Sequence, residues 1–371
     1  MIPIFIFSKN RACQLRLLLE SLKKNCGDIF DVTILYNCAI TSDISYEDMW
    51  EKGYEKLIEE EILTGIKWVK EDKDKFVSIF SVNEISHATQ VMFEFLEENE
   101  NKKVGFFVDD NVWFRKANLD ENILNSLFKE DTWCVSYRLG LNTTIQNYKT
   151  GEEQFIKLVD ATTMEDPIKT SIFGISIGYT PAPADNFYIK WPTDSKTPRS
   201  SNYLFLFSVD GAFYRAGDLL NIFDTIEKPK HKKLRRDFSK SEPLNSPHSL
   251  SLAHKIESFV NTALSNNINI IKGTKFCSPE QSCVIGTNYN RVVDAFQPTK
   301  SHYNPTDITD KYFPLGGVSE RRGNMSHQPF CRDIKDLNDL YLNNSVIDID
   351  SMDFSDVKSS HGEIPFGIKS L

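Results

Sequence analysis

Two adjacent carboxylates, Asp109 and Asp110, followed by the amide of Asn111, interrupt the apolar stretch "VGFFVDDNVWF" of this 371-residue chain. Like charges at this spacing raise each other's pKa unless a cation joins them. A divalent metal that bridges a diphosphate supplies such a charge, because Mg²⁺ or Mn²⁺ binds a few hard oxygen ligands and keeps positions open for phosphate oxygens. The alternative is a solvent-exposed turn at a sheet edge, and the Val-Trp-Phe that follows argues against it.

The elements that must position these carboxylates alternate between short apolar runs and amphipathic segments. The apolar runs that predict strands are residues 2–7, 31–36, 75–82 and 103–108. The segments that predict helices are residues 12–24, 46–61 and 83–99. This alternation is typical of parallel strands joined by right-handed crossovers, so we expect an α/β fold with a doubly wound sheet.

Ligands of such sheets bind beyond the carboxyl ends of the strands. The segments that we expect along that edge are residues 8–11, 37–39, 82–84 and 109–111. After residue 130 the alternation gives way to strand-like pieces at 132–139 and 202–215. A basic run at 227–243 precedes a predicted helix at 249–264, and we expect a less regular C-terminal elaboration of the same domain.

Composition excludes several classes of function. The net charge of −9 and the pI near 5.4 argue against general nucleic-acid binding. No stretch approaches the roughly 20 apolar residues of a membrane span, and we expect a soluble, cytoplasmic chain. The seven cysteines are scattered, so reduced thiols are expected, and Cys277, Cys283 and His302 lack the spacing of common zinc sites.

Absent motifs exclude further classes of enzyme. The first strand is not followed by G-x-G-x-x-G, and the chain contains no G-x-x-x-x-G-K-[ST], which argues against dinucleotide oxidoreductases and P-loop proteins. Neither H-E-x-x-H nor G-x-S-x-G occurs, so the metalloprotease and hydrolase signatures are missing.

The strand that ends in Asp-Asp-Asn, together with the N-terminal "PIFIFSKNRACQLRLLLESL", resembles family-2-like GT-A glycosyltransferases. In these enzymes an acidic DXD-type motif holds the metal and the nucleotide of a sugar donor. The chain is also similar to a less characterised group of bacterial and viral GT-A-like proteins, through residues 135–144, 207–215 and 359–366.

The resemblance implies a GT-A-type, Rossmann-like mixed sheet and a division of the chain. Residues 1–275 would form the transferase domain, with a nucleotide-binding half at about 1–115 and an acceptor-side half at about 116–275. Residues 276–371 would be a C-terminal extension that packs on the same domain.

The resemblance also implies roles for residues at the strand ends. Asp109 would contact the ribose or nucleotide, while Asp110 and Asn111 would face the metal. Arg11 would bind phosphate, although an arginine that opens a helix can also lie at the surface. Further nucleotide-sugar-binding positions are Ser8, Asn10, Asn37 and Gly211. The commonest family pattern has a carboxylate where this chain has Asn111, which carries no charge.

Asp210 follows an apolar segment in "FSVDGAFYR". In an inverting transferase a carboxylate deprotonates the acceptor hydroxyl, and Asp210 is the candidate for this catalytic base. It could equally bind a hydroxyl of the donor sugar, or form an Asp-Gly hairpin turn. Related proteins have a glutamate where this chain has Ser251. His361, near Glu363, is a candidate metal or diphosphate ligand, against the alternative of a solvated tail histidine.

Two further features leave alternatives open. The lysines and arginines at 228–240 could attract an anionic acceptor or a membrane surface, or lie in a solvated loop. His248 and His254 are more simply structural.

We therefore predict a glycosyltransferase that uses a UDP-sugar with Mn²⁺ or Mg²⁺ and acts on a glycan, lipid-linked or protein acceptor. One alternative is a nucleotide-sugar-binding protein without catalysis. Another is a sugar nucleotidyltransferase, against which the absence of glycine in "FSKNRACQL" argues.

Overall fold

The structure is a computed structural model of residues 1–371. It describes the chain apart from residues 39–45, 73–75, 80–81, 129–130, 148–151, 154, 160–173, 182–186, 194–202, 204, 228–255, 258–259, 262, 266–267, 288–333, 363 and 365. The basic segment 228–240, Ser251, His248, His254, His302 and Glu363 therefore lie outside the described residues.

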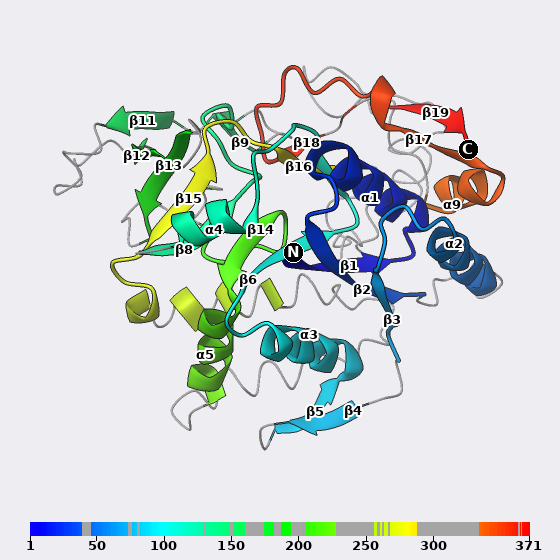
Figure 1. Cartoon of the computed structure of the whole chain (residues 1–371), viewed down its shortest axis with the longest axis horizontal. Helices are drawn as coiled ribbons and strands as arrows, with labels where there is room; N and C mark the ends of the chain where they lie inside the picture. Colours follow the sequence, from blue (N-terminus) through cyan, green and yellow to red (C-terminus); the bar gives the residue numbers. More distant parts are fainter. Residues whose placement is uncertain are drawn as a thin grey trace, which may run out of the picture.

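Within the described residues, ten strands form one mixed sheet that runs through the molecule (Figure 1). In spatial order they are β11 (Phe155–Val159), β12 (Gly174–Pro181), β13 (Phe187–Pro192), β15 (Lys275–Pro279), β8 (Thr132–Ser136), β14 (Ala212–Arg215), β6 (Lys103–Val108), β1 (Ile2–Lys9), β2 (Phe30–Asn37) and β3 (Lys67–Lys70). Strands β3, β2, β1 and β6 are parallel, and β14 runs antiparallel to both β6 and β8. The expected α/β fold with a mixed sheet is confirmed.

Strand β1 shows why its sequence forms a central strand. Side chains alternate between the two faces of a strand. Ile4 and Ile6 therefore pack in one buried cluster, and Phe5 and Phe7 pack in a second cluster on the opposite face. A strand that is covered on both faces reads as a continuous apolar run, as "IPIFIF" does.

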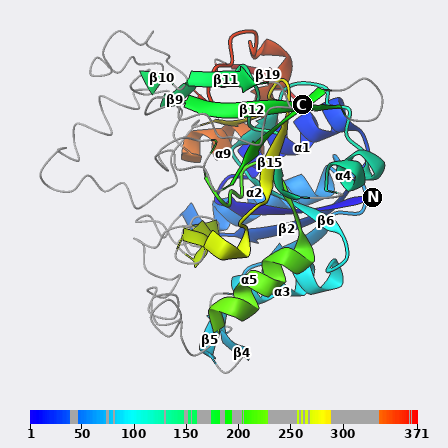
Figure 2. The ribbon, with the colours of Figure 1, turned by 90° about the vertical axis from the view of Figure 1, so that its left-hand side faces the viewer.

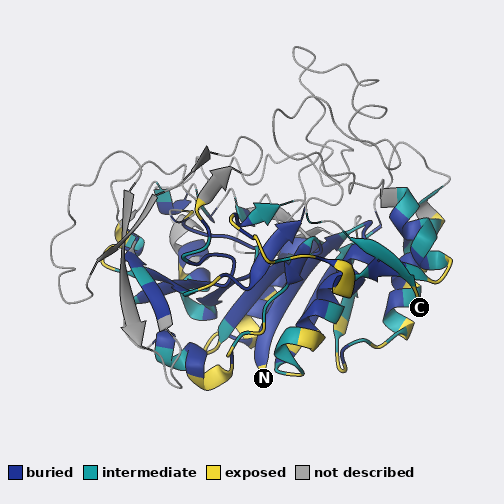
Figure 3. Cartoon of the chain, turned by 90° about the horizontal axis from the view of Figure 1, so that it is seen from above, coloured by how far each residue is buried: buried dark blue, intermediate teal, exposed yellow. Residues whose placement is uncertain are grey.

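Helices cover both faces of the sheet (Figures 1 and 2). The helices whose buried residues join the isoleucine face of β1 are α1 (Ala12–Cys26), α2 (Glu47–Glu59), α4 (Glu121–Leu127) and α9 (Ile334–Leu342). The helices that join the phenylalanine face are α3 (His87–Glu98), α5 (Ala216–Glu227) and the described helical residues between 256 and 265. The buried residues accordingly concentrate in the central strands and the inner sides of the helices (Figure 3).

The expected third strand of the sheet is wrong. Residues Phe76–Ile79 (β4) and Val82–Ser86 (β5) pair with each other as a separate antiparallel hairpin, and β3 (Lys67–Lys70) takes the place beside β2. Residues 82–84 therefore do not lie at the carboxyl ends of the main sheet. The third helix correspondingly begins at His87, after β5, and not at residue 83.

Smaller sheets flank the main one. Strands β7 (Asn111–Trp113), β16 (Val284–Thr287) and β18 (His361–Gly362) form one, β17 (Ser345–Asp348) pairs with β19 (Gly367–Ser370), and β9 (Ile145–Asn147) pairs with β10 (Glu152–Glu153). Short 3₁₀ turns occupy Ile268–Ile270 and Ile349–Ser351.

The described part of the second half agrees with the sequence prediction only in part. Of the described residues between 202 and 215, only Ala212–Arg215 form a strand, and the described residues between 256 and 265 are helical. Helix α9 and β17 pack on the face of α1 and α2, where the Tyr341 hydroxyl donates to Glu60 Oε1 at 2.7 Å.

In the described part of the chain, none of the helices has the length and apolar character needed to span a membrane.

Candidate functional site

The polar and charged side chains that could bind a ligand or take part in a reaction meet at one edge of the sheet. At this edge β1, β2, β6 and β8 end and β14 begins, and we call it the carboxyl edge. The parallel register pairs Lys9 with Asn37 and Phe7 with Val108. The residues that follow β6 are therefore beside those that end β1. Because β14 is antiparallel, its first residues start at this same edge, and the residues that follow β8 reach it too.

Asp109 is held by donors from the end of β1 and the start of α1. Its Oδ2 accepts from the Ser8 hydroxyl and the Lys9 N–H, each at 2.9 Å, and its Oδ1 accepts from Arg11 Nη1 at 3.0 Å. Ser8 in turn contacts the Tyr54 hydroxyl of α2 at 2.6 Å. Asp109 is 6% exposed, so its three hydrogen bonds compensate for the loss of water.

Arg11 also reaches the second carboxylate, since Nη1 lies 3.1 Å from Asp110 Oδ2. Burial disfavours the charge on Arg11, but Asp109 and Asp110 outweigh it and raise its pKa. Burial raises the pKa of Asp110 to about 7; Arg11 opposes this rise, and the charges of Asp109 and Asp210 add to it. The compensating cation that the sequence requires is therefore supplied at least in part by Arg11.

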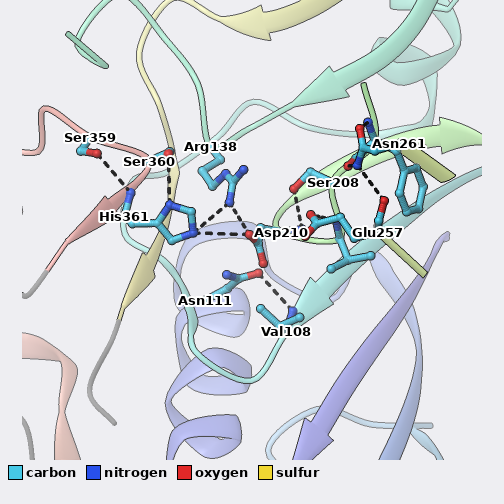
Figure 4. Close-up of polar contacts among 12 residues, drawn as sticks. Val108, Asn111, Arg138, Ser208, Asp210, Glu257, Asn261, Ser359, Ser360 and His361 are labelled. Atoms are coloured by element: carbon cyan, nitrogen blue, oxygen red, sulfur yellow. Dashed lines mark hydrogen bonds and ion pairs between the residues drawn. The ribbon is translucent and has the colours of Figure 1, made fainter. Parts of the chain in front are cut away.

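A second charged cluster lies next to the first. Arg138, which follows β8, pairs with Asp210 Oδ2, and His361 Nε2 lies 3.2 Å from Arg138 Nη1 and 3.5 Å from Asp210 Oδ2 (Figure 4). Burial by itself would raise the pKa of Asp210, but Arg138, with His361 and Asn111, holds it well below its usual range. Asp210 is thus an ionised hydrogen-bond acceptor at the carboxyl edge.

Two glycines allow this cluster to form. Gly211 has φ of 64°, a left-handed conformation that glycine adopts without strain, and a Cβ there would lie 2.8 Å from Val284 Cγ1. Gly286 in β16 pairs with both Asn111 and His361, and a Cβ there would lie 2.7 Å from the His361 ring. The missing side chain of Gly286 therefore leaves room for the His361 ring.

Asn111 is oriented by its own turn. Its Oδ1 accepts from the Val108 N–H at 3.1 Å, which assigns the oxygen, because an N–H can donate only to an acceptor. Asn111 helps to stabilise the charge of Asp210, although its buried amide nitrogen has no partner at hydrogen-bond distance among the described residues. The same turn is fixed at Asp110, whose carbonyl accepts from Thr287 N and Oγ1 at 2.7 and 2.6 Å.

Asn10 and Asn37 complete the β1–β2 side of the carboxyl edge. Asn10 has φ of 57°, which asparagine tolerates better than most residues, and its N–H donates to the Asn37 carbonyl at 3.1 Å. The Asn37 amide nitrogen donates to Glu71, which lies just after β3. The left-handed backbone conformation of Asn10 turns the chain from β1 into α1 and so directs Arg11 toward Asp109.

The donor set can be tested against a divalent metal. Among the described residues, no group of three His, Cys, Asp or Glu side chains could hold a metal ion. The Asn111 oxygen bonds to Val108, and His361 Nε2 contacts Arg138. Asp110 is the one carboxylate here that fits a metal ion, because 24% of its side chain is exposed. Among the described side chains of this edge, three carboxylates (Asp109, Asp110 and Asp210) face two guanidiniums (Arg11 and Arg138). One carboxylate suits Mg²⁺, which takes its other ligands from phosphate and water.

The structure brings together Ser8, Asn10, Arg11 and Asp109 to Asn111 on one side, and Asp210, Gly211 and His361 on the other. Sequence reasoning missed Arg138 and Glu257. Arg138 had a signal, because it follows an apolar strand at the expected edge. Glu257 had none, since burial next to Asp210 is what sets it apart and raises its pKa to about 8.

No family model matches the chain, and no curated protein matches it.

Proposed function

We propose that the chain is a GT-A-type glycosyltransferase that takes a sugar from a UDP-sugar, with Mn²⁺ or Mg²⁺, and transfers it to a glycan, lipid-linked or protein acceptor. The observation that carries the proposal is the arrangement at the carboxyl edge. Asp109 and Asp110 at the end of β6 meet Arg11 at the start of α1, beside Asp210 at the start of β14. Ligands of such sheets bind at the switch point between neighbouring strands, here β1 and β6.

The start of α1 supports a diphosphate at this position. Helix α1, all of whose residues are described, has no side-chain cap and no acidic residue in its first turn. Its N-terminus therefore keeps the partial positive charge that attracts anions. Arg11 adds a guanidinium that suits phosphate oxygens. Asp109 would hold Arg11 in place and bind the nucleotide.

Asp110 would hold the metal, because its carboxylate is the one that fits. When bound, the metal would neutralise the charge that develops on the diphosphate leaving group. Arg11 and the first turn of α1 would bind the same group from the other side. The pairing of Asp110 with a cation is favoured here because Asp109 and Asp210 both repel its negative charge.

Asp210 has two candidate roles, and its surroundings favour one. A general base works best when its pKa lies near the working pH. The ion pair with Arg138 keeps Asp210 ionised, as suits a residue that accepts a hydrogen bond from a sugar hydroxyl. We therefore assign Asp210 to orienting the transferred sugar. Replacement of Asp210 by Asn should then weaken binding of the UDP-sugar more than that of UDP. If Asp210 were the catalytic base, the same replacement would lower turnover and leave binding unchanged.

The test is calorimetric titration of UDP, GDP and CDP into the protein, with and without Mn²⁺. We expect one nucleotide to bind tightly, to require the metal, and to lose at least tenfold in affinity in Asp110→Ala. Asp31→Ala is the matched control, because Asp31 is exposed near the amino end of β2, at the opposite edge. If none of the three nucleotides binds the wild-type protein, the proposal is refuted.

A non-catalytic nucleotide-sugar-binding protein is the second candidate, favoured by Asn111. Its oxygen is engaged by Val108, so the chain has one metal-binding carboxylate here instead of two. Metal-dependent binding of a UDP-sugar with neither transfer nor hydrolysis would decide for this candidate.

A further inference from the structure

The loop of residues 207–210, which carries Asp210, is held by side chains and not by its own backbone. Each of its four consecutive N–H groups donates to a side-chain oxygen. The Phe207 N–H donates to Asn261 Oδ1 at 3.0 Å, the Ser208 N–H to the Tyr214 hydroxyl at 2.7 Å, the Val209 N–H to Glu257 Oε1 at 3.3 Å, and the Asp210 N–H to Ser208 Oγ at 3.2 Å. Buried backbone N–H groups pair with backbone, side-chain or water oxygens, and in this loop all four acceptors are side chains.

Two of the four acceptors come from one helical turn. Glu257 and Asn261 are four residues apart in the helical stretch, so their side chains share a face. Asn261 bonds to both backbone groups of Phe207, because its Nδ2 also donates to the Phe207 carbonyl at 2.6 Å. The same Nδ2 lies 2.8 Å from the Glu257 carbonyl, which fixes its rotamer. Both side chains face the loop next to Asp210 (Figure 4).

The side-chain hydrogen bonds to the backbone N–H groups of this loop end at Asp210. The Gly211 N–H returns to the backbone ladder by donating to the Phe106 carbonyl at 2.8 Å, and β14 follows from Ala212. On the other side, Asp210 pairs with Arg138. The position of the Asp210 carboxylate therefore depends on the backbone ladder of β14, which follows it in the chain, and on Glu257 and Asn261, which hold the residues that precede it.

We propose that Glu257 and Asn261 are positioning residues that hold loop 207–210 and thereby aim Asp210 at the sugar. The part about the sugar rests on the proposed function, while the hold on the loop does not. Glu257 needs only a neutral oxygen for this task, and its burial next to Asp210 favours the protonated carboxyl. Glutamine at this position should therefore keep the hydrogen bond to Val209.

Hydrogen–deuterium exchange of the full chain tests the hold on the loop. In Glu257→Ala and Asn261→Ala, peptides that cover residues 203–212 should exchange at least tenfold faster, with the rest of the chain unchanged. Glu257→Gln should exchange no faster than the wild type does. The control is Asn338→Ala, which removes a buried amide that donates to the Met49 carbonyl far from the loop. Unchanged exchange in both alanine variants overturns the proposal.

Should an alanine variant fail to fold, Asn261→Asp removes the donor to the Phe207 carbonyl and keeps an oxygen for its N–H. This variant must still accelerate exchange of the same peptides, and no acceleration overturns the proposal.

Kinetics test the aiming of Asp210. Glu257→Ala and Asn261→Ala should lower sugar transfer or donor hydrolysis at least tenfold, with UDP affinity unchanged and activity restored in Glu257→Gln. A loss of UDP affinity in step with activity would indicate general damage and overturn the aiming role. If the wild-type protein binds no nucleotide, the proposed function fails but the exchange result stands, so the two failures are distinguishable.

Discussion

Replacement of Arg11 by methionine probes the centre of the site. Arg11 Nη1 is shared by Asp109 and Asp110, at 3.0 and 3.1 Å, and the side chains of Arg11 and Asp109 are 8% and 7% exposed. Methionine fills similar space but leaves the buried carboxylate of Asp109 and the half-buried carboxylate of Asp110 without their guanidinium. Removing one partner of a buried ion pair costs about 3–5 kcal/mol. We expect a loss of this size in the free energy of unfolding at pH 8, measured by urea denaturation.

The loss should depend on pH, and the sign follows from Asp110. Arg11 lowers the pKa of Asp110 against burial and two like charges, so its removal raises that pKa further. The folded variant then keeps a proton that the unfolded chain loses above about pH 4. Because the folded state binds more protons, its stability falls as pH rises. The deficit of Arg11→Met should therefore be smaller at pH 5 than at pH 8.

Two controls sharpen this test. Lys24→Met breaks an ion pair with Asp350, but these side chains are 49% and 68% exposed, so the cost should stay below about 1 kcal/mol. Adding Asp109→Asn and Asp110→Asn to Arg11→Met removes the uncompensated charges and should restore much of the stability. A deficit below about 1 kcal/mol, or one that is equal at pH 5 and pH 8, would refute the reasoning.

Three other substitutions have defined outcomes. Glu257→Gln should stabilise the protein at pH 7 by a few kcal/mol and flatten the decline between about pH 5 and pH 8, because its raised pKa makes the folded state bind the extra proton; equal pH profiles for variant and wild type in urea denaturation would contradict this. Gly286→Ala should displace the His361 ring and lower the free energy of unfolding by about 1–3 kcal/mol. The displacement should shift the imidazole resonances of His361, and unshifted resonances would show that the contact is absent. Gly211→Ala combines a positive φ with a contact to Val284, so we expect a larger loss of thermal stability than in Gly286→Ala, and a smaller loss would argue against strain from a Cβ at this turn.

Local pattern predicted the central elements well. The run "IPIFIF" and the leucine face of residues 12–24 identified β1 and α1, and "KVGFFV" identified β6 with both carboxylates at its end. These elements pack on two faces or present a wide apolar stripe, so their period in the sequence is strong.

The third strand shows where local pattern fails. Strand β3, Lys67–Lys70, is the edge strand next to β2, and its residues are exposed or half-buried. An edge strand needs little apolar surface and often carries lysine, so "KWVK" has no strong signal. The more apolar segment 75–82 reads as a sheet strand, although its described residues Phe76–Ile79 pair with β5 in a separate hairpin.

The sequence alone thus determined that carboxylates end β6, that an asparagine and an arginine follow β1, and that an α/β sheet would place them at one edge. Their partners were decided by tertiary structure. Arg11 meets Asp109 across 98 residues, Arg138 meets Asp210 across 72, and His361 reaches Arg138 across 223. Periodicity reports which face of an element is buried. Which residues meet at an edge depends on strand order and direction, here the antiparallel insertion of β14 between β6 and β8, and these are set by the packing of the whole chain.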